Sequence, residues 1–179
     1  MKIPVVSTSI TTAEIPGKVA LAVELGGCLQ GCKGCHSPHL SQPVEDPMSY
    51  IGFTMFLTKA LHMYPEINAV VLMGGTCNLG LPLSDLKMLI EGMSETHKID
   101  FGLYSGNPND DLDYFLGIKG LQWFKTGNYI EELGGLESPK TNQRFYEKQL
   151  IIKTDNSGVY VGKSYEWEDK TAQFQKVTN

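Results

Sequence analysis

Short apolar runs that end at turn-forming residues alternate with longer stretches in which apolar residues recur at helical spacing. The runs predict four buried strands, at Lys18 to Leu25, Asn68 to Met73, Ile99 to Tyr104 and Leu121 to Thr126. The longer stretches predict helices over Tyr50 to Met63, Ser84 to Thr96 (with Ser84 as its N-cap) and Asp111 to Leu116. Strands and helices that alternate in this way form a mostly parallel sheet, and four strands are too few for an eight-unit barrel. We therefore expect an α/β fold, in the form of a partial (β/α) barrel.

The last part of the chain has a different pattern. Gln149 to Thr154 and Val159 to Ser164 flank the turn-rich segment 155–158, which predicts a small C-terminal β-hairpin. The chain beyond Trp167 is polar, and we expect it to be loosely held. Residues 1–179 should form a single domain, with a barrel core over about 15–130 and a loop and β tail over about 131–179.

Composition and charge narrow the class of protein. Of the 179 residues, 41% are hydrophobic, which is enough for one ordinary core. No run approaches the ~18 apolar residues of a membrane span, and the N-terminus lacks the basic-then-apolar order of a secretory signal, so we expect a cytoplasmic protein with no membrane contact. The net charge is −5 and the Lys and Arg residues are scattered, which argues against a nucleic-acid partner.

Three of the four cysteines lie in one short stretch, GCLQGCKGCHSPHL, at residues 27–40. Cys28, Cys32 and Cys35 have the spacing CxxxCxxC and follow the first predicted strand, at the sheet edge where parallel α/β folds bind ligands. An iron–sulfur cube needs a ligand for each of its four irons, so three cysteines leave one iron open to a small molecule. A zinc site with Cys77 as the fourth thiolate, or three unrelated reduced cysteines, are the alternatives.

This loop resembles the cluster loop of the radical S-adenosylmethionine (SAM) enzymes. The form GCKGCHSP is similar to that of the small activating enzymes of glycyl-radical proteins, as is IPGK at residues 15–18. The resemblance implies a [4Fe-4S] cluster on Cys28, Cys32 and Cys35, with SAM chelated to the open iron. It also implies the partial barrel of that family.

The ends of the other predicted strands carry the expected SAM contacts. Gly74 and Gly75 can approach a ligand closely, and they match the GGE or GGD element that contacts the SAM amino group in this family. Thr76 stands in place of the acidic residue of that element. Ser105 and Lys125 lie at strand ends from which the family reaches SAM with polar side chains. A plain tight turn and ordinary strand-end residues are the alternatives.

Two further residues, Cys77 and His36, directly follow these elements in the chain. Cys77 follows the glycine turn directly, and we expect it to face the core as a small apolar group. His36 follows the third cysteine of the loop. It could line the substrate channel or contact the cluster, or it could be a surface ring.

The stretch from Lys125 to Tyr146 is similar to the C-terminal signature of the activating components of anaerobic ribonucleoside-triphosphate reductases, with GNYIEEL and TNQR elements. This resemblance implies a partner, the large subunit of such a reductase, and an electron donor such as reduced flavodoxin. Asn142, Gln143 and Arg144 could pair with groups at a docking face, or could tie a long loop to the barrel.

Together these resemblances imply a radical SAM oxidoreductase that activates a glycyl-radical enzyme. Another small radical SAM enzyme, acting on a different protein, peptide or small molecule, is the first alternative. A zinc-binding interaction protein is the second.

Overall fold

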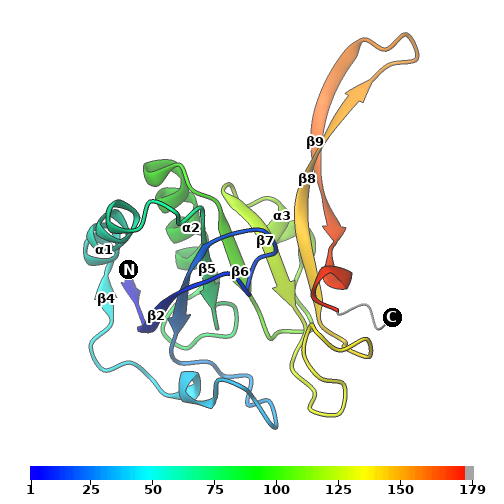
Figure 1. The fold of residues 1–179 in the computed structure, drawn as a ribbon. Coiled ribbons are helices and arrows are strands. Elements are labelled where there is room, and N and C mark those ends of the chain that lie inside the picture. Colours follow the sequence, from blue (N-terminus) through cyan, green and yellow to red (C-terminus); the bar gives the residue numbers. More distant parts are fainter. Residues whose placement is uncertain (176–179) are drawn as a thin grey trace.

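The computed structural model describes residues 1–175, which form one open sheet with helices on one face (Figure 1). The sheet has seven strands in the spatial order β2 (Val5–Thr11), β3 (Ala20–Leu25), β5 (Ala69–Met73), β6 (Phe101–Tyr104), β7 (Leu121–Thr126), β8 (Arg144–Thr154) and β9 (Tyr160–Asp169). A second, two-stranded sheet pairs β1 (Lys2–Ile3) with β4 (Met48–Ser49). The helices are α1 (Tyr50–Met63), α2 (Leu83–His97) and α3 (Leu112–Leu116), with 3₁₀ turns η1 (Pro38–Ser41) and η2 (Thr171–Phe174).

The four central strands are parallel and follow one another in chain order. β3, β5, β6 and β7 pair in sequence, and α1, α2 and α3 connect them. Crossovers of one hand that always step in the same direction place all three helices on one face. The antiparallel strands β2 and β9 form the two edges and do not pair with each other, so the sheet is open among the described residues. The carboxyl ends of the four parallel strands meet at one edge, where ligand-binding loops are expected.

Side-chain alternation along β3 separates the two faces of the sheet. Leu21 and Val23 point into the larger apolar cluster, between the sheet and the helices. Ala20 and Ala22 belong to the smaller cluster on the opposite face, where Ile15 and Phe145 also pack. Because alanine fills little space, this helix-free face has room for a cavity near the carboxyl ends of the strands.

The predicted strands and helices are confirmed to within a few residues, with one wrong cap. The Ser49 hydroxyl caps α1 by accepting a hydrogen bond from the Gly52 amide at 3.0 Å. Helix α2, however, begins after Pro82, whose carbonyl accepts from the Leu86 amide at 2.9 Å. Ser84 therefore lies inside the helix, directly after its first residue, Leu83.

The two ends of the chain contain more regular structure than the sequence suggested. The edge strand β2 was not expected, although its β-branched sequence VVSTSIT favours a strand. The hairpin begins at Arg144, five residues before the predicted start. The expectation of a loose end beyond Trp167 is wrong as far as residue 175. The Thr171 hydroxyl accepts from the Phe145 amide at 2.9 Å, and Phe174 packs on Phe145 with ring centroids 4.8 Å apart. For residues 176–179 that expectation lies outside the described residues.

Within residues 1–175, no helix has both the length and the apolar character that a membrane crossing requires.

Candidate functional site

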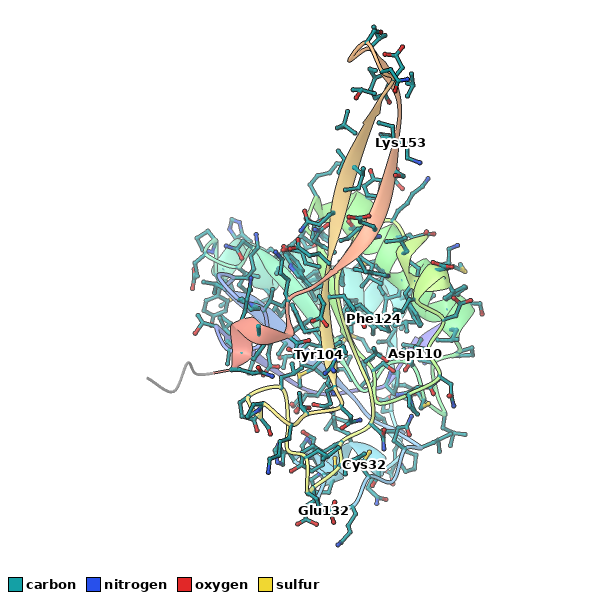
Figure 2. All side chains as sticks on the ribbon, turned by 90° about the vertical axis from the view of Figure 1, so that its right-hand side faces the viewer. Cys32, Tyr104, Asp110, Phe124, Glu132 and Lys153 are labelled. Atoms are coloured by element: carbon teal, nitrogen blue, oxygen red, sulfur yellow. The ribbon has the colours of Figure 1, made fainter. Side chains whose placement is uncertain are left out.

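The cysteine stretch forms a loop at the carboxyl end of β3, and it is held at its base. The Cys28 amide donates to the Leu40 carbonyl at 2.8 Å, and the Leu29 amide donates to the Cys77 carbonyl at 2.8 Å. Gly31 and Gly34 have φ values of 59° and 70°, which allow two tight turns between the cysteines. Figure 2 shows Cys32 at one end of the molecule, opposite the projecting hairpin that carries Lys153.

The three cysteines of the loop line one cavity of about 320 Å³. Three of the five predicted SAM contacts, Gly74, Ser105 and Lys125, line the same cavity. Its other walls include Leu40, Met73, Tyr104, Tyr129 and Gln143. Within residues 1–175, no three His, Cys, Asp or Glu side chains have the arrangement that a bound metal ion would require. The donor set itself, three thiols of one loop that line a partly apolar cavity, fits a cluster that keeps one iron open.

Cys77 neighbours the cysteine loop but is not among the residues that line this cavity. Its sulfur accepts a hydrogen bond from the Gln30 side chain at 3.0 Å, beneath the cysteine loop. Burial raises the pKa of the Cys77 thiol, so the neutral form is favoured. The expectation that Cys77 faces the apolar core is wrong, because the chain leaves β5 at the glycine turn and Cys77 packs under the loop instead. It does not line the cavity with the other three, as a four-thiolate zinc site would require.

The two glycines of the turn after β5, Gly74 and Gly75, have different surroundings. Gly74 has a φ of 83°, and a Cβ there would lie 2.8 Å from the Leu25 carbonyl oxygen, so glycine is required beside the cavity. Gly75 does not line the cavity. A Cβ at Gly75 would lie 2.6 Å from Cδ1 of Leu103, in the core. The structure thus places Gly74 beside the cavity and Gly75 in a packing position.

Thr76 reaches the cavity only through Ser105, because the two hydroxyls are hydrogen-bonded to each other. The buried Ser105 hydroxyl also accepts from the Asn107 amide at 3.0 Å. Next to it, Thr126 donates to a carboxylate oxygen of Asp110 at 3.0 Å. Desolvation raises the pKa of Asp110, while hydrogen bonds from Ser105 and Thr126 oppose that shift. Asp110 is therefore linked to Thr76 through the Ser105 hydroxyl.

Asp110 was missed because the segment NPNDD was interpreted as helix capping. The cap is Asp111 alone, whose carboxylate accepts from the amides of Asp113 and Tyr114 at 3.0 and 3.3 Å. A helix needs one N-cap. The second acidic residue of the pair was the signal that could have pointed to Asp110.

Lys125 places a cation in the cavity wall. Its ammonium lies 5.9 Å from the ring centroid of Tyr104, whose hydroxyl is hydrogen-bonded to the Glu14 carbonyl. Burial lowers the pKa of Lys125 to about 8, although attraction to Cys32, Cys35 and Glu14 favours the charged form. Such a desolvated ammonium is suited to bind a carboxylate, because water competes weakly there.

Replacing Lys125 with methionine should weaken SAM binding at least about tenfold while making the cluster-free protein more stable at pH 7, by about 1–3 kcal/mol. The folded-state pKa of about 8 lies below the ordinary lysine value of 10.5, so the unfolded chain holds this proton more tightly. The loss of wild-type stability that the buried Lys125 charge causes is thus complete below pH 8. It disappears as pH rises from about 8 towards 10.5. Urea unfolding of both proteins across this window measures the difference. A variant that is less stable than wild type at pH 7 would contradict this account.

A second cavity of about 520 Å³ adjoins the first on the helix-free face of the sheet. Both cavities are lined by Cys35, Lys125 and Gln143. The second is also lined by His36, which is exposed and packs on Tyr129 with ring centroids 4.6 Å apart. Its further polar lining includes Ser9, Thr11, Glu14, Glu24 and Glu137. His36 is therefore a surface ring that also borders this second cavity.

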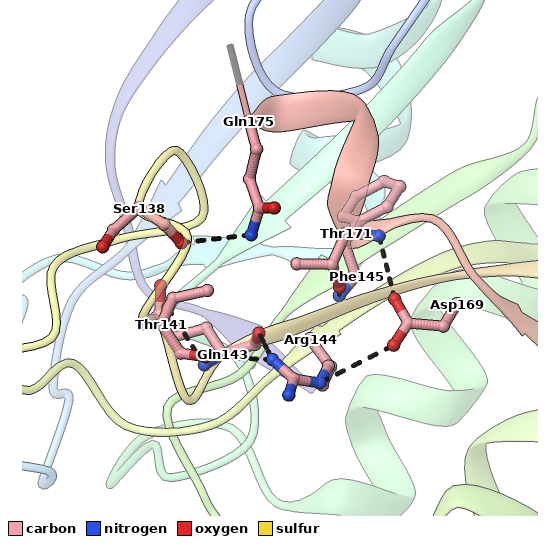
Figure 3. A network of polar contacts seen from close by, with 8 residues as sticks. All are labelled: Ser138, Thr141, Gln143, Arg144, Phe145, Asp169, Thr171 and Gln175. Atoms are coloured by element: carbon pink, nitrogen blue, oxygen red, sulfur yellow. Dashed lines mark hydrogen bonds and ion pairs between the residues drawn. The ribbon is translucent and has the colours of Figure 1, made fainter. Parts of the chain in front are cut away.

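The side chains of the TNQR element form hydrogen bonds and an ion pair within the same chain (Figure 3). The Arg144 guanidinium donates to the carbonyls of Thr141 and Gln143 at 3.0 and 2.9 Å, and its Nε lies 3.6 Å from a carboxylate oxygen of Asp169. The Asn142 amide donates to the Asn128 carbonyl at 2.9 Å. These contacts correspond to the second alternative of the sequence analysis, a long loop tied to the barrel.

Gln143, between these two residues, points the other way. It is only 4% exposed, and its side-chain amide donates to the Gly127 carbonyl at 3.2 Å while the residue lines both cavities. Sequence reasoning placed all three residues of the element together and missed this difference. The period-two alternation of an extended segment is the signal that separates Gln143 from its neighbours.

No family model matches the chain, and neither the curated proteins nor the solved structures contain a match to it.

Proposed function

We propose that this chain is a radical SAM activating enzyme, which cleaves SAM reductively at a [4Fe-4S] cluster and generates a glycyl radical on the large subunit of an anaerobic ribonucleoside-triphosphate reductase. The observation that carries the proposal is a shared cavity. Cys28, Cys32 and Cys35 line it together with Ser105 and Lys125, which come from the carboxyl ends of two parallel strands. Each cysteine of the loop would hold one iron of the cluster.

When bound, the cluster supplies an electron from a donor such as reduced flavodoxin to SAM, which then yields methionine and the 5′-deoxyadenosyl radical that abstracts a hydrogen atom from glycine. The chain's own residues bind and orient SAM. The Lys125 ammonium pairs with its carboxylate, and its amino group lies against the Ser105 side chain, which Thr76 and Asn107 hold in place. Gly74 lets the backbone approach the ligand closely.

The second cavity gives the target glycine a route to the site. It adjoins the cysteine cavity, and its rim includes the exposed side chains of His36 and Glu137, so a loop from a large protein can reach it from outside. The Gln143 amide stands between the two cavities, where it can hydrogen-bond to a peptide group. Closure of the second cavity by such a loop would exclude water and oxygen from the radical.

The direct test is anaerobic mixing with the large reductase subunit, SAM and a reductant. We expect a glycine-centred doublet in electron paramagnetic resonance, and no doublet when Cys32→Ala replaces the wild-type protein. If SAM is cleaved but no glycyl radical forms with any ribonucleotide reductase from the same source, the partner assignment is wrong. Another small radical SAM enzyme would then be the better description.

A further inference from the structure

The hairpin of β8 and β9 extends well beyond the rest of the sheet as a two-stranded arm (Figure 1). β7 pairs with β8 only over Arg144 to Glu147. From Leu150 to Thr154, β8 pairs only with β9 among the described residues. We call residues 150–165 the arm. An isolated two-stranded hairpin is marginally stable in water, and three or more strands are needed for independent stability.

One face of the arm is mostly apolar, and its apolar side chains are exposed. Leu150 lies opposite Tyr165, Ile152 opposite Lys163, and Thr154 opposite Tyr160, all on the same face. The apolar members are about half exposed, at 49% for Leu150, 47% for Tyr165, 56% for Ile152 and 60% for Tyr160. The opposite face carries the pairs Gln149 with Glu166, Ile151 with Ser164, and Lys153 with Gly162.

The middle of the free edge of β8 lacks the features that usually protect an edge strand. Natural edges carry charges, prolines or bulges that discourage pairing with another chain. The segment Gln149 to Ile152 has none of these, and charges lie only at its two ends, on Lys148 and Lys153. β9, in contrast, carries Lys163, Glu166, Glu168 and Asp169, and its pairing with β8 shifts register near the tip.

We propose that the free edge of β8 pairs with the same edge of a second copy of this chain, antiparallel about a two-fold axis at Ile151. The polarity of the segment QLIIK is symmetric about that residue. In this register Leu150 lies opposite Ile152 of the second copy, and Gln149 lies opposite Lys153. Apolar residues then face apolar ones and no like charges meet.

The arrangement is specific and favourable for two reasons. Moving the axis by one residue, to Ile152, would place Ile151 opposite Lys153 and Leu150 opposite Thr154, so apolar residues would face polar ones. In the symmetric register, two marginal hairpins become one four-stranded antiparallel sheet. The axis is far from the cysteine loop, because the arm projects from the opposite end of the molecule (Figure 2). This inference does not depend on the proposed function.

The test is the oligomeric state of the full chain, with its thiols kept reduced, by sedimentation equilibrium over a range of concentrations. Wild type should form a dimer. Ile151→Lys should raise the dimer dissociation constant at least about tenfold, because two like charges would meet at the axis. The matched control is Ser164→Lys, which places the same charge directly across the hairpin on β9 and should leave the dissociation constant unchanged.

A charge exchange tests the position of the axis. Ile151→Lys and Ile151→Glu should each dimerise weakly alone, whereas their mixture should form a heterodimer at least about tenfold more tightly, since opposite charges then meet. Circular dichroism of each variant checks that it is folded. The proposal is overturned by a monomeric wild type, by a dimer that Ile151→Lys does not weaken, or by a mixture that shows no heterodimer preference.

Discussion

Replacing Cys32 with alanine is expected to abolish both the intact cluster and all SAM cleavage, whereas replacing Cys77 with alanine should leave both in place. Cys32 lines the cavity with Cys28 and Cys35, and a cluster that loses one of only three protein ligands is not retained. Cys77 does not line that cavity, and its sulfur accepts a hydrogen bond from Gln30, which does. Iron and sulfide content after anaerobic reconstitution measures the first effect, and methionine and 5′-deoxyadenosine released from SAM measure the second.

Cys28→Ala and Cys35→Ala serve as matched variants and should behave as Cys32→Ala does. Equal loss of iron in the Cys77 variant would show that the fourth cysteine is a ligand. If all four variants lose zinc, and the wild-type protein shows no iron–sulfur absorption after reconstitution, the zinc-binding alternative would be correct.

Replacing Gly75 with valine is expected to destabilise the fold by about 1–3 kcal/mol or more, without a selective loss of SAM affinity. A Cβ at this position would lie 2.6 Å from Cδ1 of Leu103 and 3.4 Å from Cδ2 of Leu86, both of them buried, so the core would have to shift. Urea unfolding of the cluster-free protein measures the free energy of unfolding. SAM binding is then measured on reconstituted protein that remains folded.

Gly162→Val is the matched control, because a Cβ at Gly162 would meet no atom within 4 Å, and its stability should be nearly that of wild type. The sequence analysis assigned Gly75 to the SAM contact. If Gly75→Val weakens SAM binding while the free energy of unfolding is unchanged, that assignment is right and the packing explanation is wrong.

The sequence determined the features that depend on local spacing. The spacing of Cys28, Cys32 and Cys35 places three thiols on one short glycine-rich loop, whatever the remainder of the fold does. Apolar runs located the four parallel strands because a strand buried on both faces must be apolar along its length. The predicted strand ends also indicated that Ser105 and Lys125 lie at one edge of the sheet. In the structure, both residues line the same cavity as the three cysteines.

The tertiary structure alone decided which way individual groups face. Gly74 and Gly75 are equivalent in the sequence, yet one borders the cavity and the other packs on Leu103, because a chain that leaves a strand can turn either side towards the core. Cys77 and Gln143 differ from their expected places for the same reason. Their surroundings come from segments far away in the chain, and such long-range packing has no periodic signature in the sequence.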